Sequence, residues 1–288
     1  MAVAVLAVAT SGPLIAAAVV PALAIAFWRN AMASAVILPA VLLRRRSELA
    51  GLDRRERRLA LLAGLLLALH FATWVPAVTI TSVASATALV GTQPVWSALI
   101  ARYRGEQVTR AVWFGIGLSL SGAALLTGAD FQISGMALVG DLLALVGGMF
   151  AAAYMAAGSE VRRSVSTTTY TAICYSTTSV LLLVVCLAAG QDLWGYDGID
   201  WWKLVALTAG AQLLGHSLFN VVLKRVSPTV VSLSILLEIP GAAVIAAIFL
   251  EGQEVPLLAA PAALLLLAGL AIVIRSAGKG AQPAVPVE

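Results

Sequence analysis

Two stretches of the chain share a register that decides the fold: His70–Pro94 (HFATWVPAVTITSVASATALVGTQP) and His216–Pro240 (HSLFNVVLKRVSPTVVSLSILLEIP). The chain has two histidines, and each stands 24 residues before a proline, so the histidine pair and the proline pair are both 146 residues apart. Two later glycines of the first copy also have counterparts in the second, with one inserted residue: Gly105 with Gly252, and Gly122 with Gly269. Chance is the alternative, but agreement at four positions favours an internal duplication.

The composition places both copies in a membrane. Of the 288 residues, 61% are hydrophobic and 11% are charged, against about 45–50% and about 25% in soluble domains. The apolar residues form continuous runs of about 20, the length a helix needs to cross a hydrocarbon core of about 30 Å, and they do not alternate as in barrel strands. We therefore predict an all-α integral membrane protein with ten transmembrane helices. The runs are Ala2–Val19, Pro21–Leu43, Leu59–Thr79, Ser82–Ala101, Ala111–Thr127, Ala137–Ala157, Thr167–Ala189, Leu204–Leu223, Pro228–Leu250 and Pro256–Ile274.

The basic residues are sorted by membrane side. With a cytoplasmic N-terminus, all 18 Lys and Arg residues except Arg29 and Lys203 fall in cytoplasmic connections or in the C-terminal tail, as the positive-inside rule requires. The external connections carry the acids Asp130, Asp192, Asp197, Asp200, Glu251 and Glu254. We predict a multi-pass protein of the plasma membrane with both termini cytoplasmic. The sorting also explains the net charge of +4 without a nucleic-acid partner.

The repeat has a topological consequence. Five spans are an odd number, so the second copy inserts upside down, and inverted repeats with interrupted helices are the architecture of secondary transporters. We predict a first repeat over residues 1–130, a second over residues 131–277 and a disordered tail over residues 278–288. The segment Ser47–Arg58 is expected to be a solvated linker. A cleaved signal peptide is the alternative for the first span, but no basic residue precedes Arg29.

The chain resembles a known family at several motifs. Leu89–Glu106, with Gln93-Pro94-Val95 and Gly105-Glu106, and then Gly115–Gly122 look like the fourth and fifth spans of an EamA-type unit. Further matches are Arg29, Gly140-Asp141, and Leu237-Glu238-Ile239-Pro240 with Gly252. The whole chain thus resembles a ten-span exporter of the drug/metabolite transporter superfamily. The resemblance implies transport of small metabolites, often amino acids or amphipathic compounds, commonly outward.

Ionisable residues inside the spans are the candidates for function, because each costs about 2.5–3.5 kcal/mol to insert. His216 and Glu238 lie eleven residues on either side of a turn near Ser227, so both should reach the midplane about 17 Å from that turn. His70 should reach the same depth from the opposite face. Thr208, Gln212, His216 and Asn220 recur every four residues and predict one polar stripe. The predicted substrate-binding residues are His70, Trp74, Gln93, Trp96, Gln212, His216 and Asn220, with Glu238 coupling protons.

Structural roles remain open for several of these residues. The histidines can instead join helices through hydrogen bonds, and Glu238 can be paired with His216. Arg29 is interpreted as a structural charge that binds Asp141 or helix carbonyls. Cys174 and Cys186 are twelve residues apart on one predicted helix, about 18 Å by helical rise, so we expect free thiols.

The function predicted from these observations is secondary active transport of a small metabolite by alternating access, in the direction of export. The sequence has no nucleotide-binding, hydrolase or metal motif, so we expect no enzyme activity, no cofactor and no metal. The expected partners are a small-molecule substrate, membrane lipid and protons, and the protein is expected to be a monomer or a homodimer. A lipid flippase is the main alternative, and a membrane-embedded enzyme is a weaker one.

Overall fold

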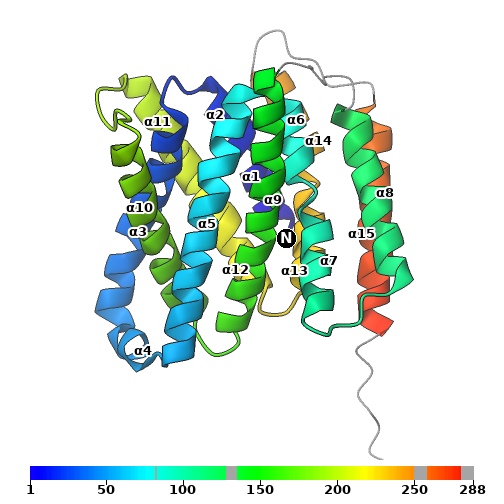
Figure 1. Cartoon of the computed structure of the whole chain (residues 1–288), viewed down its shortest axis with the longest axis horizontal. Helices are drawn as coiled ribbons and strands as arrows, with labels where there is room; N and C mark the ends of the chain where they lie inside the picture. The colour runs from blue at the N-terminus through cyan, green and yellow to red at the C-terminus, as the bar shows by residue number, and fades with distance from the viewer. Residues whose placement is uncertain (82, 128–134, 250–257, 280–288) are drawn as a thin grey trace, which may run out of the picture.

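The computed structural model describes residues 1–81, 83–127, 135–249 and 258–279, and every regular element within these ranges is a helix (Figure 1). Among the described residues, five helical runs are long and apolar enough to cross a membrane. Four are Ala22–Arg44 (α3), Arg54–Ile80 (α5), Gly135–Val161 (α9) and Thr167–Ala188 (α10). The fifth runs from Gly198 to Val222 as α11 (Gly198–Leu207), η1 (Thr208–His216) and α12 (Ser217–Val222). The chain is therefore a multi-pass membrane protein.

The remaining apolar helices are shorter. They are α1 (Ala2–Ala9), α2 (Ser11–Ala17), α6 (Val83–Val90), α7 (Gln93–Tyr103), α8 (Arg110–Thr127), α13 (Pro228–Ile235), α14 (Glu238–Phe249) and α15 (Ala259–Lys279). Three predicted spans are thus each divided into two helices, with breaks at Thr10, at Gly91-Thr92 and at Leu236-Leu237. Of the sequence predictions, Asp130, Glu251, Gly252, Glu254 and tail residues 280–288 lie outside the described residues. Gly278 and Lys279, predicted to begin the disordered tail, are instead the last two residues of α15.

A proline stands shortly after each break. A proline ring clashes with the carbonyl four residues earlier and provides no N–H to bond it. Four residues before Pro13 is Ala9, the last residue of α1. Four residues before Pro94 is Val90, the last residue of α6, and four before Pro240 is Leu236, the residue after α13. Pro39 and Pro76 lie inside α3 and α5 without ending them, so a proline alone does not cause a break.

The prediction that Ser47–Arg58 is a solvated linker is wrong, because most of this segment is helical. Residues Arg46–Gly51 form a short helix, α4, and α5 already begins at Arg54. A capping box starts α5: the Asp53 carboxylate accepts from the Glu56 N–H at 2.7 Å, and Glu56 accepts from the Asp53 N–H at 2.9 Å. Four N–H groups are free at a helix start, and this reciprocal pair lets α5 begin within a highly charged segment.

Helices from distant parts of the sequence pack side by side. Extensive contacts join α5 to α9, α3 to α10, and α8 to α15, and the last pair stands at one end of the molecule in Figure 1. Small residues permit close approach between α8 and α15. A Cβ built on Gly115 would lie 2.7 Å from the Gly269 carbonyl oxygen, and the Ser119 hydroxyl donates to the Leu266 carbonyl at 3.3 Å.

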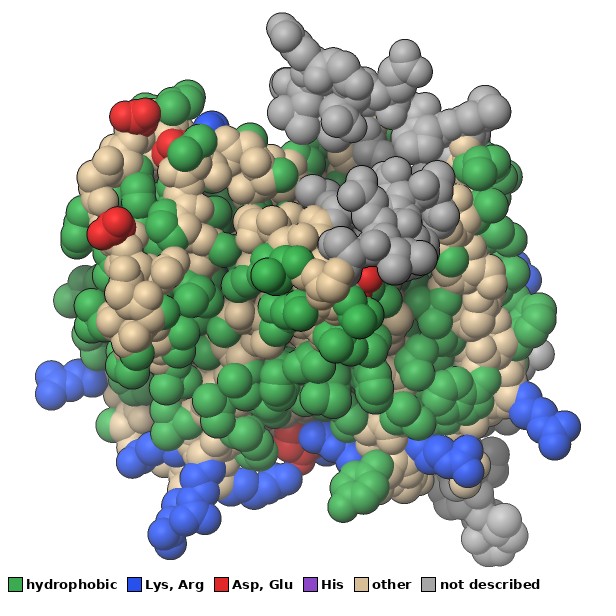
Figure 2. Space-filling view, turned by 45° about the horizontal axis from the view of Figure 1, so that its top comes forward, with side chains coloured by type: hydrophobic (Ala, Val, Ile, Leu, Met, Phe, Trp, Pro, Cys, Tyr) green, Lys and Arg blue, Asp and Glu red, His purple; other side chains and the backbone are tan. Residues whose placement is uncertain are grey.

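Charged side chains collect at the edges of this bundle. Figure 2 shows Lys and Arg gathered along one edge, with a broad hydrophobic surface beside them. We call that edge the basic face and define it by the arginines and lysine that line two hollows there: Arg54, Arg55, Arg58, Arg104, Arg163, Lys224 and Arg225. It is the face that the sequence predicts to be cytoplasmic.

Candidate functional site

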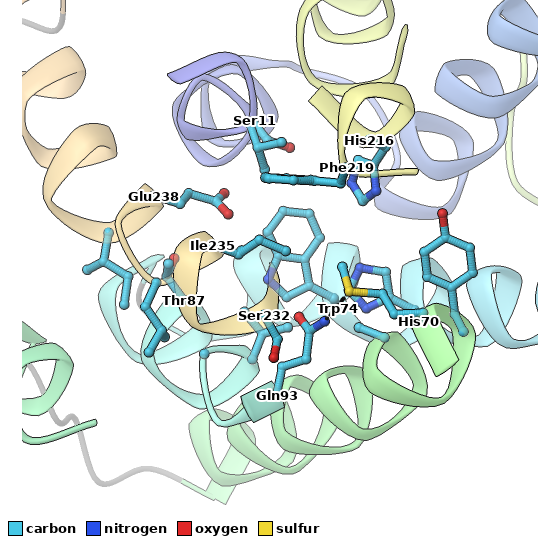
Figure 3. Close-up of a pocket in the computed structure, with 18 residues that line it drawn as sticks. Ser11, His70, Trp74, Thr87, Gln93, His216, Phe219, Ser232, Ile235 and Glu238 are labelled. Atoms are coloured by element: carbon cyan, nitrogen blue, oxygen red, sulfur yellow. Dashed lines mark hydrogen bonds between the residues drawn. The ribbon is translucent and has the colours of Figure 1, made fainter. Parts of the chain in front are cut away.

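A cavity of about 50 Å³ lies where the interrupted helices meet. Its walls come from α1, α2, α5, α6 and α7 in the first half of the chain, and from α9, η1, α12, α13 and α14 in the second. Residues at or next to all three helix breaks contribute to the lining (Figure 3). One water takes about 30 Å³ in the liquid, so the accessible space of the central cavity holds very few waters and is smaller than a metabolite.

Five predicted site residues line this central cavity: His70, Trp74, Gln93, His216 and Glu238 (Figure 3). They come from four separate elements. His70 and Trp74 are on α5, Gln93 begins α7, His216 ends η1 and Glu238 begins α14. The arrangement brings both histidines and the carboxylate together from opposite halves of the chain. Substrate binding by the first four residues and proton coupling by Glu238 stay predictions.

Glu238 is the acidic group of the cavity. Its carboxylate points into the cavity toward the same space as Ser11 (Figure 3). Within the described part of the chain it has no ion-pair partner within 4 Å, and no hydrogen bond to His216 joins the two. The alternative of a structural Glu238–His216 pair is therefore wrong. The Arg29 guanidinium is close enough to interact electrostatically with Glu238.

The histidines have different surroundings. His70 Nδ1 lies 2.9 Å from the Gly147 carbonyl oxygen. Because a carbonyl only accepts, Nδ1 carries the hydrogen of this bond. The His70 ring stacks on Trp74, with centroids 5.9 Å apart and planes 7° apart. His216 Nδ1 and Trp74 Nε1 are buried without hydrogen-bond partners in the described residues. Each such group costs about 1–3 kcal/mol, which a bound molecule or water in the cavity would offset.

Gln93 closes one side of the cavity. Its side-chain amide donates to the sulfur of Met155 at 3.1 Å, joining α7 to α9. A thioether is a weak acceptor, so this contact holds the two helices together without fully satisfying the amide. Gln93 is 5% exposed.

The prediction that Thr208, Gln212, His216 and Asn220 form one polar stripe on the eighth span is wrong. Thr208–His216 is a π-helix, in which the Ser217 N–H bonds the Gln212 carbonyl five residues back. Residues four apart therefore no longer stack on one another. Gln212 instead accepts from Arg29 Nε at 3.0 Å, and Asn220 accepts from Arg162 at 2.7 Å and donates to the Tyr154 hydroxyl at 2.7 Å. Neither lines the cavity.

Two further predictions need correction. Trp96 does not line the cavity, because its indole N–H turns back to the Thr92 hydroxyl at 3.2 Å. Arg29 does not bind Asp141, which accepts from the Thr81 hydroxyl at 2.9 Å. The partners of Arg29 are Gln212, the Ser11 hydroxyl at 3.2 Å and the ring of Phe71, whose centroid lies 4.4 Å from the guanidinium carbon.

The sequence reasoning missed several lining residues: Ser11, Thr87, Tyr154, Phe219 and Ser232. Hydroxyl and aromatic side chains enter membranes at low cost, so they do not stand out in an apolar span as a charge does. For Ser11 a signal existed in the run Ser11-Gly12-Pro13, because that proline is incompatible with a continuous first helix.

Comparisons with known proteins agree with this architecture. The model of the EamA-like transporter family matches the chain twice, over residues 1–128 and 138–275. The chain belongs to the EamA-like transporter family. This places it in the drug/metabolite transporter superfamily, and the two matches cover nearly the whole chain.

A solved structure described as "Crystal structure of protein" is 19% identical, with a TM-score of 0.77, and the match covers 97% of this chain and 96% of that one. At this identity the similarity concerns the fold alone. No curated protein matches the chain.

Proposed function

We propose that this EamA-family protein is a secondary active transporter that exports a small metabolite, an amino acid or an amphipathic compound, across the plasma membrane. The proposal includes ten spans in two inverted five-helix repeats, with both termini cytoplasmic. One observation carries it: the central cavity lies where interrupted helices of both halves meet, and a carboxylate without an ion-pair partner in the described residues points into it. Transporters of this architecture hold substrate near the midplane between the repeats.

The size of the cavity supports alternating access. At about 50 Å³ it is far below the range of about 300–1,000 Å³ that is usual for small-molecule sites. The site must therefore expand when substrate binds. The helix breaks at Thr10, Gly91-Thr92 and Leu236-Leu237 lie at its wall, so tilting one half of each interrupted helix changes the volume without disturbing the other half.

Glu238 is the group that we propose to couple protons to this movement. Glu238 has no ion-pair partner within 4 Å in the described residues, so exclusion of water favours its neutral acid. Water or a cationic group admitted by opening adds to the effect of Arg29 and stabilises the ionised form. Opening and proton release are then linked, so a proton gradient can drive the cycle.

The cavity also bears on the flippase alternative. A lipid carrier needs a polar groove open toward the membrane, through which a headgroup passes while the acyl chains stay in lipid. The central cavity is instead lined by elements of both halves, at the place where the interrupted helices meet. A lipid flippase stays the alternative function, and labelled lipids in the flux assay below distinguish it from a metabolite carrier.

The test is flux in proteoliposomes with an imposed pH gradient, using labelled amino acids, amphipathic drugs and labelled lipids in parallel. We expect uptake of a small metabolite that follows the gradient, and we expect Glu238→Gln to remove the dependence on the gradient while the protein stays folded in detergent. Asp192→Asn, an exposed acid remote from the cavity lining, is the matched control and should behave as wild type. A Gln variant with wild-type flux and pH dependence would reduce Glu238 to a structural residue.

A further inference from the structure

A second hollow opens on the basic face. Its volume is about 370 Å³, within the range of about 300–1,000 Å³ that is usual for small-molecule sites. The walls come from the C-terminal part of α7, the end of α9 and the connection between α12 and α13. We call it the basic vestibule, defined by its four cations Arg104, Arg163, Lys224 and Arg225.

The basic vestibule carries uncompensated positive charge. Its lining includes one carboxylate, that of Glu106, against the four cations. Arg163 is paired with Glu160 at 3.1 Å, and Arg104 donates to the Ala156 carbonyl at 3.3 Å. Lys224 and Arg225 are exposed and make no ion pair within the described residues. The positive-inside rule explains why cations are on this face, but a hollow lined by one sign of charge also concentrates the field and attracts anions.

The basic vestibule and the central cavity are lined by residues of the same three helices. On each of these helices, a residue that lines the vestibule is within four positions of one that lines the central cavity. The vestibule residues are Ser97 on α7, Ala156 on α9 and Thr229 on α13. The corresponding cavity residues are Gln93, Met155 and Ser232. The Gln93–Met155 hydrogen bond joins two of these helices, α7 and α9, on the side of the central cavity. The Ser97 hydroxyl is buried without a partner in the described part of the chain.

We propose that the basic vestibule is the loading site of the transporter and that it binds small molecules carrying an oxyanion, a carboxylate or a phosphate. The proposal rests on the transport function proposed above and adds the charge of the substrate group that is recognised first. Lys224 and Arg225 attract the oxyanion, and the vestibule hydroxyls lie on the way to Gln93. Substrate then passes into the central cavity when the Gln93–Met155 contact opens.

The test measures occupancy of the vestibule and does not need transport. Ser159 lines the vestibule and bonds only its own helix, so Ser159→Cys provides a thiol reporter, while native Cys174 and Cys186 are buried at 0% exposure. In detergent, an anionic thiol reagent should react about 10-fold faster than a cationic one of equal size, and added salt should reduce the ratio. Inorganic phosphate and acetate should slow labelling by neutral N-ethylmaleimide, and tetramethylammonium should not.

Two double variants in the reporter background decide the outcome. Lys224→Gln/Arg225→Gln should abolish the anion preference and the protection, whereas Arg44→Gln/Arg46→Gln, exposed arginines of the same charge outside the vestibule, should keep both. Equal rates for the two reagents, or protection by cations, would overturn the proposal. So would protection by anionic lipid in nanodiscs with none by free phosphate, because the ligand would then be a headgroup. The flux assay can fail or succeed independently of each result.

Discussion

Arg29 carries a positive charge into the middle of the bundle with 0% exposure. Its guanidinium bonds Gln212 of the π-helix and Ser11 at the start of α2, and it lies over the Phe71 ring of α5. One side chain therefore joins the π-helix and the start of α2 to the long helix α5. This arrangement favours the structural role that the sequence predicted, although the partners differ.

A lysine at this position tests that role. Arg29→Lys keeps the charge but loses the planar fork and the ring stacking, so Gln212 or Ser11 is left without its donor. We expect the free energy of unfolding to fall by about 1–3 kcal/mol, measured by thermal unfolding in detergent. Arg58→Lys, on an exposed arginine of the basic face, should leave stability unchanged. Equal melting of Arg29→Lys and wild type would show that the fork is dispensable.

At the residue scale, polarity is what made the site predictable. His70, His216, Glu238 and Gln93 were recognisable because such groups are costly in a membrane, and all four line the central cavity. Gln212 and Asn220 are equally polar, yet they bond Arg29, Asn30, Tyr154 and Arg162. The cost of insertion identifies a buried polar group but does not distinguish a lining residue from one that is satisfied by protein.

At the element scale, the helix α4 acts as an external cap on α10. Glu48 of α4 accepts from the Ser166 N–H at 2.6 Å, from the Ser166 hydroxyl at 2.8 Å and from the Thr169 hydroxyl at 2.8 Å. Partial burial by itself would raise the pKa of this carboxyl, but these hydrogen bonds and that of Arg45 lower it to about 2. A carboxylate at a helix N-terminus also interacts favourably with the helix dipole.

This cap predicts a pH-dependent contribution to stability. The pKa of Glu48 is below its usual value of 4.5, so its contribution is complete above about pH 4.5 and is lost as the pH falls toward 2. Glu48→Gln should lower the free energy of unfolding by about 1–2 kcal/mol at pH 7, and the difference from wild type should vanish at the acid end of the titration. Asp192→Asn, on an exposed acid outside both hollows, should show no difference. A constant deficit across this range would contradict the cap.

The sequence predicts two of the helix breaks, but it does not predict the π-helix or α4. The breaks at Gly91-Thr92 and Leu236-Leu237 agree to within one residue in the two copies, as Pro94 and Pro240 indicate. The π-helix has no such marker, because a change from four-residue to five-residue hydrogen bonding needs no particular composition. The helix α4 was missed because a segment rich in arginine resembles a solvated linker. The sequence alone does not show that Glu48 of α4 accepts hydrogen bonds from Ser166.

At the scale of the whole molecule, the two halves are similar but not equivalent. The first span is broken at Thr10, whereas the sixth, α9, is continuous from Gly135 to Val161. The duplicated register predicted two copies, and the family match over 1–128 and 138–275 supports them. Differences within the copies concentrate at the central cavity, where the α1–α2 break and the π-helix lie on the side opposite the Gln93–Met155 contact.

The proposed inverted arrangement predicts which connections face the cytoplasm. If the basic face is cytoplasmic, Arg58 lies inside, and Asp192, in the connection between α10 and α11, lies outside. Both are exposed, and native Cys174 and Cys186 are free and fully buried, so they give little background. We expect Asp192→Cys to react with a membrane-impermeant maleimide in intact cells, and Arg58→Cys to react only after permeabilisation. The reverse pattern would invert the topology and place the basic vestibule outside, which the positive-inside rule opposes. Reaction of both thiols in intact cells would exclude five spans in each half, because Arg58 and Asp192 are separated by an odd number of predicted spans and must lie on opposite sides.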